Sequence, residues 1–147
     1  MLENLETDFI GRKEIFYKEI DSTQKEIWRR IENKKIEDGT IIIADIQNNA
    51  IGTHGRVWYT DEESNIAFSI YLKSNCRVSN LNGITIEIAQ ILVNIFKDKY
   101  NIKLEIKEPN DLVVNNKKIG GILTETKLNG ETAKYMVIGI GINTNKT

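Results

Sequence analysis

The sequence predicts an α+β fold, in which a mixed, largely antiparallel sheet is flanked by helices. Strand-like segments come first, a long helix-like segment follows, and hairpin-like segments come last. This order is typical of α+β domains rather than of doubly wound parallel sheets. The chain has 147 residues, 40% of them hydrophobic, which is enough for one domain with a continuous core.

The first third of the chain alternates strand and helix signals. Glu14–Ile20 is rich in aromatic and β-branched residues and is expected to form a strand. Asp21-Ser22-Thr23 offers a helix start, and apolar residues then recur at helical spacing from Ile27 to Ile31. Thr40–Ile46 is an apolar run with the length of a buried strand. We therefore expect a strand, a helix and a second strand in succession.

The middle of the chain contains a long segment without periodicity. Residues 47–65 include two glycines and several amides, and they are expected to form a connection that is long for a compact domain. Connections of this kind are usually functional or disordered. Asn65–Lys73 alternates apolar and other residues and predicts the next strand.

The second half is expected to hold one helix and several strands. Leu81–Tyr100 has apolar residues three and four positions apart, the strongest amphipathic helix pattern in the chain, and should cover one face of the sheet. Asn115-Asn116 and Asn129-Gly130 are turn signals, and Asn-Gly between apolar runs is typical of a hairpin. The strands around these turns are expected at Lys103–Ile106, Leu112–Val114, Lys118–Lys127 and Ala133–Asn143.

Composition excludes several classes of function. Twenty Lys and Arg against 21 Asp and Glu give a net charge of −1, so neither nucleic acid nor a membrane is expected as a partner. Cys76 is the single cysteine, which excludes an internal disulfide and fits a reducing cytoplasm. His54 is the single histidine, so a histidine-based metal site is not expected. Because no segment resembles a signal peptide or a membrane span, we expect a soluble, cytoplasmic protein.

Four segments could carry chemistry. Residues 52–56 (GTHGR) combine glycine amides that can turn toward an anion with one guanidinium, but they lack the Walker and dinucleotide spacings. Residues 107–112 (KEPNDL) hold the only proline, and composition alone favours a plain turn there. Gly120-Gly121 and residues 139–143 (GIGIN) place glycines inside strands. Such glycines indicate either close approach of a ligand or a bulge or tight strand packing.

Together, in order and spacing, five segments resemble the biotin protein ligase family. They are residues 21–23, 52–58, 107–112, 118–123 (KIGGIL) and 139–143. The likeness runs from about Ile15 to Asn145 and is more specific than any one of its motifs. It implies the family's fold, a mixed sheet flanked by helices and related to the lipoate protein ligases.

The resemblance also implies a reaction. Family members adenylate biotin with ATP and Mg²⁺ and transfer the biotinyl group to a lysine of a biotin carboxyl carrier domain. Biotin and ATP are then substrates, and no tightly bound cofactor is implied. Since no protein nucleophile is required, the protein is expected to act by positioning and by stabilising charge.

The resemblance implies catalytic roles for three residues. Lys118 matches the lysine that contacts the activated carboxylate and the α-phosphate, where an ammonium offsets developing negative charge. Arg56 would grip phosphate together with the amides of its loop. Asp111 could orient or deprotonate the incoming amine.

The resemblance further implies a set of substrate-binding residues. Ser22, Thr23 and Gln24 match a Ser-Thr-Asn segment at the biotin site, with Gln24 in place of the usual Asn. Gln47 matches an amide near the ureido ring, and Trp58 could offer a face to adenine. The other expected substrate-binding residues are Ile51, Gly52, Thr53, Gly55, Lys107, Asn110, Gly120, Gly121, Gly141 and Asn143. None is expected to bind a metal directly.

Two departures from the family pattern leave alternatives open. Ile51 stands where the family has an arginine that reaches phosphate and the biotin carboxylate, and loss of such a charge-assisted bond costs about 1.5–3 kcal/mol. Glu108 replaces a tryptophan and puts a carboxylate beside a polyphosphate site. Besides a biotin ligase, the sequence is therefore compatible with an impaired, ligase-like biotin-binding protein, or with a ligase for lipoate or another acyl acid.

The resemblance covers the catalytic portion of family members. Residues 1–147 are expected to form one catalytic domain, without the N-terminal helix-turn-helix or the small C-terminal β-barrel of other members. Some members dimerise through the sheet edge, so an exposed edge here could pair with a second copy to give a homodimer.

Overall fold

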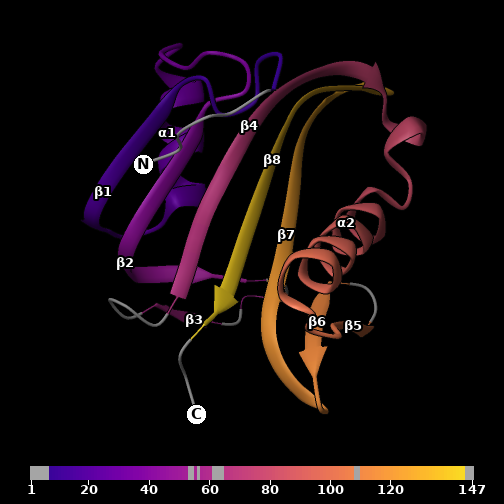
Figure 1. The fold of residues 1–147 in the computed structure, drawn as a ribbon. Helices are drawn as coiled ribbons and strands as arrows, with labels where there is room; N and C mark the ends of the chain where they lie inside the picture. Colours follow the sequence, from indigo (N-terminus) through magenta and orange to yellow (C-terminus); the bar gives the residue numbers. More distant parts are fainter. Residues whose placement is uncertain (1–6, 53–54, 56, 61–64, 108–109, 145–147) are drawn as a thin grey trace.

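A computed structural model of the chain describes residues 7–52, 55, 65–107 and 110–144, together with the backbone of residues 57–60. Its centre is one eight-stranded sheet, in which seven strands follow the order β1-β2-β4-β8-β7-β6-β5 and β3 pairs with β2 (Figure 1). The strands are β1 (Glu14–Ile20), β2 (Ile41–Ile51), β3 (Val57–Thr60), β4 (Asn65–Arg77), β5 (Glu105–Lys107), β6 (Asp111–Val114), β7 (Lys117–Asn129) and β8 (Thr132–Asn143).

The sheet is mixed and largely antiparallel, as the sequence predicts. Among the described pairings, β1 runs parallel to β2, and the others are antiparallel. The parallel pair needs a crossover, which α1 (Thr23–Glu32) supplies. The three long strands β4, β8 and β7 lie side by side at the centre (Figure 1).

Two helices cover opposite faces of this sheet. Ile27 of α1 packs with Ile42, Tyr71 and Val137, whereas α2 (Ile84–Tyr100) packs over a cluster that includes Met136 and its neighbours on β8. Because successive residues of a strand point to opposite faces, Met136 lies in the cluster under α2 and its neighbour Val137 lies in the cluster under α1. The predicted amphipathic helix is confirmed, but it begins at Ile84. The short 3₁₀ turn Val78–Leu81 precedes it.

Backbone conformation confirms the two predicted hairpins. Asn115 and Asn116 have φ of 50° and 65°, as the two central residues of a type I′ turn require. Gly130 has φ of 63° and is the first of the two residues between the paired positions Asn129 and Thr132. Asn and Gly tolerate positive φ, which is why these dipeptides mark turns in a sequence.

The prediction of a long connection without structure over residues 47–65 is wrong for residues 47–51 and 57–60. β2 continues to Ile51, and the backbone of residues 57–60 forms β3, which pairs antiparallel with β2. The register between these two strands shifts between Gln47 and Ala50. Such an irregularity interrupts the period of two, so the strand pattern is invisible in the sequence.

Among the described residues, no helix is both long enough and apolar enough to cross a membrane.

Candidate functional site

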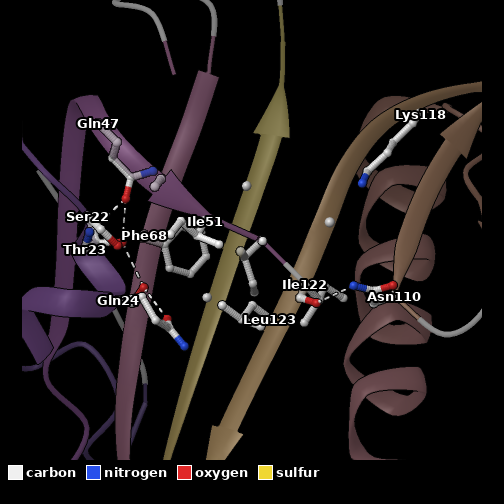
Figure 2. A pocket seen from close by; sticks show the side chains of 17 residues that line it. Ser22, Thr23, Gln24, Gln47, Ile51, Phe68, Asn110, Lys118, Ile122 and Leu123 are labelled. Carbon is white, nitrogen blue, oxygen red and sulfur yellow. Dashed lines mark hydrogen bonds between the residues drawn. The ribbon is translucent and has the colours of Figure 1, made fainter. Parts of the chain in front are cut away.

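A cleft opens on the α1 side of the sheet, where the start of α1 meets β2, β4, β8 and β7. Its volume is about 520 Å³, including the open mouth. Figure 2 shows side chains from these separate segments turned toward one space. The lining residues are Ser22, Thr23, Gln24, Gln47, Ala50, Ile51, Gly52, Phe68, Ser69, Asn110, Lys118, Gly121, Ile122, Leu123, Gly139, Ile140 and Gly141.

The chemistry of the lining changes from one end of the cleft to the other. Neutral polar side chains of α1 and β2 gather at one end, and Lys118 with Asn110 lies at the other (Figure 2). Ile51 and Leu123 lie between them. The cleft therefore suits an elongated molecule with a neutral polar head, an apolar middle and an anionic end.

Hydrogen bonds between α1, β2 and β4 organise the polar end. The backbone N–H of Thr23 donates to Gln47 Oε1 at 2.8 Å. The Thr23 hydroxyl lies 3.1 Å from the same oxygen and 2.8 Å from Ser69 Oγ. All three side chains are buried, so an unpaired polar atom among them would be costly. The N-terminus of α1 is thereby fixed to the sheet.

Gln24 occupies the centre of this network. Its Oε1 accepts from the Ser69 hydroxyl at 2.8 Å, and its Nε2 donates to the Val137 carbonyl at 3.2 Å and to Glu125 at 3.0 Å. A Cβ added to Gly139 would lie 2.6 Å from Gln24 Oε1, closer than real Cβ contacts. Glycine at position 139 is therefore what leaves room for the Gln24 amide.

Ser22 and Asp21 hold the start of α1 in place. Ser22 is the N-cap, and its side chain accepts from the backbone N–H of Lys25 at 3.2 Å, as the sequence predicts for a helix start. Asp21 accepts from Ser22 N–H at 2.8 Å and from two nitrogens of Arg29 at 2.9 and 2.7 Å. The hydrogen bonds from Arg29 lower the pKa of Asp21 to about 2, against the opposing effect of burial.

The other end of the cleft rests on the β6–β7 hairpin. Lys118 Nζ lies 3.1 Å from Asp111 Oδ1, and 43% of the Lys118 side chain is exposed. Asn110 is nearly buried, and its Nδ2 donates to the Ile122 carbonyl at 3.2 Å. In return, the Ile122 N–H donates to the Asn110 carbonyl at 3.0 Å. An accessible ammonium therefore stands beside a loop that is firmly tied to β7.

The paired glycines of β7 have different surroundings. A Cβ on Gly120 would lie 2.8 Å from the Gly141 carbonyl oxygen, so this glycine allows close packing with β8. A register shift between Leu112 and Val113 lies opposite, which agrees with a bulge. A Cβ on Gly121 would meet its nearest atom at 3.7 Å, an ordinary contact, and only Gly121 of the two lines the cleft.

Most of the predicted site residues meet at this cleft. The predicted residues in its lining are Ser22, Thr23, Gln24, Gln47, Ile51, Gly52, Asn110, Lys118, Gly121 and Gly141. Asp111 joins the site through its ion pair with Lys118.

Other predicted residues are not brought to the cleft. Lys107 on β5 and Gly55 are both exposed. Gly120 packs against β8. Asn143 is the last residue of β8, and its buried Oδ1 accepts no hydrogen bond within the described chain. A binding role for these four stays a prediction. The residues Thr53, His54, Arg56 and Glu108 and the side chain of Trp58 lie outside the described residues.

Seven lining residues were not among the predicted site residues: Ala50, Phe68, Ser69, Ile122, Leu123, Gly139 and Ile140. Four of these, Ile122, Leu123, Gly139 and Ile140, lie in segments that the sequence analysis singled out, whereas Ala50, Phe68 and Ser69 were missed. Ser69 matters most, because its hydroxyl joins Thr23 to Gln24. A signal was present, since Ser69 is a polar residue in the middle of an apolar strand, where a hydroxyl needs a partner. Within the described residues, no group of three or more His, Cys, Asp and Glu side chains is arranged to hold a metal ion.

The sheet, its two helices and a cleft whose lining changes from neutral polar to cationic define an α+β domain with a cleft suited to an elongated acid. Residues 16–143 match the family model of the biotin/lipoate A/B protein ligase family, and the chain belongs to this family. It is 32% identical over 142 residues to the bifunctional ligase/repressor BirA of Bacillus subtilis, covering 97% of this chain and 43% of that protein. It is 30% identical over 150 residues to the biotin–protein ligase of Homo sapiens, covering 96% of this chain and 20% of that protein.

Solved structures agree with this assignment. The biotin protein ligase of Aquifex aeolicus in complex with biotin and ATP superposes with a TM-score of 0.70 at 27% identity, covering 92% of this chain and 55% of that one. A mutant of the same enzyme in complex with biotin gives a TM-score of 0.71 at 29% identity, covering 94% and 55%. The chain thus spans less than half the length of the curated relatives above and just over half of these structures.

Proposed function

We propose that residues 1–147 form the catalytic domain of a biotin protein ligase, which adenylates biotin and transfers the biotinyl group to a lysine of a biotin carboxyl carrier domain. The observation that carries this proposal is the order of chemistry along the cleft. Biotin has a neutral ureido head, an aliphatic chain and a terminal carboxylate, and the lining offers neutral hydrogen-bonding groups, apolar side chains and a lysine in that order.

The ureido head would lie at the end formed by Thr23, Gln24 and Gln47. These side chains carry no net charge and offer both donors and acceptors, which suits a neutral urea. The aliphatic chain would then pass Ile51 and Leu123, and the carboxylate would arrive near Lys118.

Activation at the Lys118 end follows from charge. A biotin carboxylate oxygen attacks the α-phosphorus of ATP, the bond to the β-phosphate oxygen breaks, and pyrophosphate leaves. The Lys118 ammonium offsets the negative charge that gathers between carboxylate and phosphate. Asp111 holds this ammonium 3.1 Å away before the substrates bind. Arg56 and the amides of residues 52–55 would contact the phosphates, and Trp58 would contact adenine.

Transfer completes the reaction. A neutral lysine amine of the carrier domain attacks the acyl carbon of biotinyl-adenylate, AMP leaves, and the nitrogen gives up a proton. Asp111, the carboxylate paired with Lys118, would accept that proton or orient the amine. Mg²⁺ would enter with ATP as the co-substrate, because this ion is usually bound by substrate phosphates and one or two carboxylates. The expected setting is the cytoplasm.

The comparisons support the ligand pair, since the related Aquifex aeolicus enzyme is known in complex with biotin and ATP. One observation favours a second candidate, a biotin-binding protein that adenylates poorly. Ile51 lines the cleft, at the position where the resemblance places an arginine.

Calorimetric titration of the purified chain with biotin, alone and with Mg–ATP, tests the proposal when a pyrophosphate-release assay follows on the same sample. We expect binding and release that depend on both biotin and ATP. Binding without release would favour the second candidate. Release with lipoic acid but not with biotin would refute the assignment of biotin as substrate and favour a lipoate ligase.

A further inference from the structure

A second hollow, here called the outer hollow, adjoins the cleft where α1 and β7 approach each other. This outer hollow has a volume of about 1010 Å³ including open solvent, and Gln24, Ser22, Ile51, Gly52 and Leu123 line both spaces. Lys25, Trp28 and Glu125 line the outer hollow only. Glu125 therefore lies outside the lining of the cleft but contacts Gln24, which is part of that lining.

The Gln24 amide nitrogen donates two hydrogen bonds, and neither goes to Ser69, which bonds to the amide oxygen instead. Nε2 donates to Glu125 Oε1 at 3.0 Å and to the Val137 carbonyl at 3.2 Å. The same Glu125 oxygen also accepts from Trp28 Nε1 at 2.9 Å. The contact joins Gln24 and Glu125, which are 101 positions apart, so it ties α1 to β7 beside the cleft.

These partners fix which way the Gln24 amide points. An ionised carboxylate and a carbonyl only accept hydrogen bonds, so a flipped amide would set its own oxygen against two acceptors. In the observed orientation, Oε1 takes the Ser69 hydroxyl with one lone pair. Since Gln24 lines the cleft and, among the described residues, Ser69 donates the one hydrogen bond to this oxygen, we infer that its second lone pair can accept from a donor in the cleft.

We propose that Glu125 is a positioning residue that sets the hydrogen-bond polarity of the cleft's polar end. Acting through Gln24, it makes this end accept a hydrogen bond, and it thereby favours a head group with an N–H, such as a urea, over a head group without one, such as a dithiolane. The inference rests on the proposed function, because that function supplies the class of acid.

Biotin and lipoic acid provide the test, because both carry a valeric acid chain and only biotin has N–H groups in its head. We expect Glu125→Ala to weaken biotin binding about tenfold in calorimetric titration, equivalent to about 1.4 kcal/mol. The affinity for lipoic acid should stay within about twofold, since its dithiolane head has no N–H and makes no hydrogen bond to Gln24 Oε1 that the substitution could remove. Glu125→Gln keeps an oxygen acceptor and should restore biotin binding.

Trp28→Phe is the matched control, because it removes the other donor to the same carboxylate oxygen and leaves the Gln24 contact in place. We expect it to keep the preference for biotin over lipoic acid. Equal loss of both ligands in Glu125→Ala, or no loss of biotin, would refute a polarity role for Glu125.

A second measurement separates this inference from the proposed function. In the free protein, the side-chain NH₂ of Gln24 should exchange slowly with solvent by NMR, and Glu125→Ala should speed that exchange. If wild-type protein binds no biotin but the exchange responds as expected, the proposed ligand fails and the positioning role stands. Unchanged exchange would overturn the positioning role whatever the ligand.

Discussion

Asp21→Asn tests whether one ion pair holds the start of α1. Asn keeps an oxygen that can accept from the Ser22 N–H but loses the charge that Arg29 contacts at 2.7 and 2.9 Å. A pKa lowered from 3.8 to about 2 corresponds to at most about 2.4 kcal/mol, since a tenfold change in acidity is worth about 1.36 kcal/mol. The Arg29 and Asp21 side chains are 45% and 33% exposed, so solvent screening reduces the expected loss to about 1 kcal/mol.

The pH dependence has a definite sign. A carboxylate whose pKa is lowered by folding stabilises the folded state above its unfolded pKa, and this contribution is lost as pH falls through the folded pKa of about 2. The difference between wild type and Asp21→Asn should therefore be full at pH 7 and roughly halved at pH 3.

Urea unfolding followed by circular dichroism at pH 7, 5 and 3 measures both quantities. Asp45→Asn is the control, because the ion pair of Asp45 with Lys18 is longer, at 3.5 Å, and the two side chains are 40% and 62% exposed. This control should change the free energy of unfolding by less than about 0.5 kcal/mol. If the loss in Asp21→Asn were the same at pH 7 and pH 3, the ion pair would not be its cause.

Three further changes address the site itself. Lys118→Met should lower the rate of pyrophosphate release about 100-fold or more. Lys127→Met, at an exposed position further along β7, is the control and should leave the rate unchanged. Equal rates in the two variants would show that Lys118 takes no part in the reaction. Gly139→Ala should cost about 1–3 kcal/mol in urea unfolding, because its Cβ would displace an amide with three hydrogen bonds. Gly121→Ala, with its nearest contact at 3.7 Å, should change stability by less than about 0.5 kcal/mol, and a similar cost for both would contradict the packing argument. Ile51→Arg should raise pyrophosphate release about tenfold if the missing arginine limits adenylation, and an unchanged rate would place the limitation elsewhere.

Local patterns were enough to predict the elements whose stability is local. The spacing of apolar residues from Leu81 onward indicates α2, and Ser22 at the N-cap indicates α1. The Asn115-Asn116 and Asn129-Gly130 pairs indicate two hairpins, because few other residues tolerate the positive φ of such turns. Each of these signals lies within a few residues of the structure that it specifies.

β3 shows where local patterns fail. Its partner β2 shifts register between Gln47 and Ala50, so the alternation that marks a strand is broken where the pairing begins. The pairing depends on contacts between two segments, and neither segment alone carries a clear period of two. The same limit applies to Ser69, whose role depends on the register between β2, β4 and the start of α1.

Gln24 illustrates the difference between locating a site residue and knowing what it offers a ligand. The family resemblance locates Gln24 at the biotin site, but the direction of its amide is set by Ser69, Glu125 and Val137, which lie 45, 101 and 113 positions away. An amide turned the other way would offer a donor to the cleft instead of an acceptor, with the same sequence at residues 22–24. Specificity at this position is therefore a property of the assembled sheet, and a substitution at Glu125 or Gly139 can change it without touching the recognisable motif.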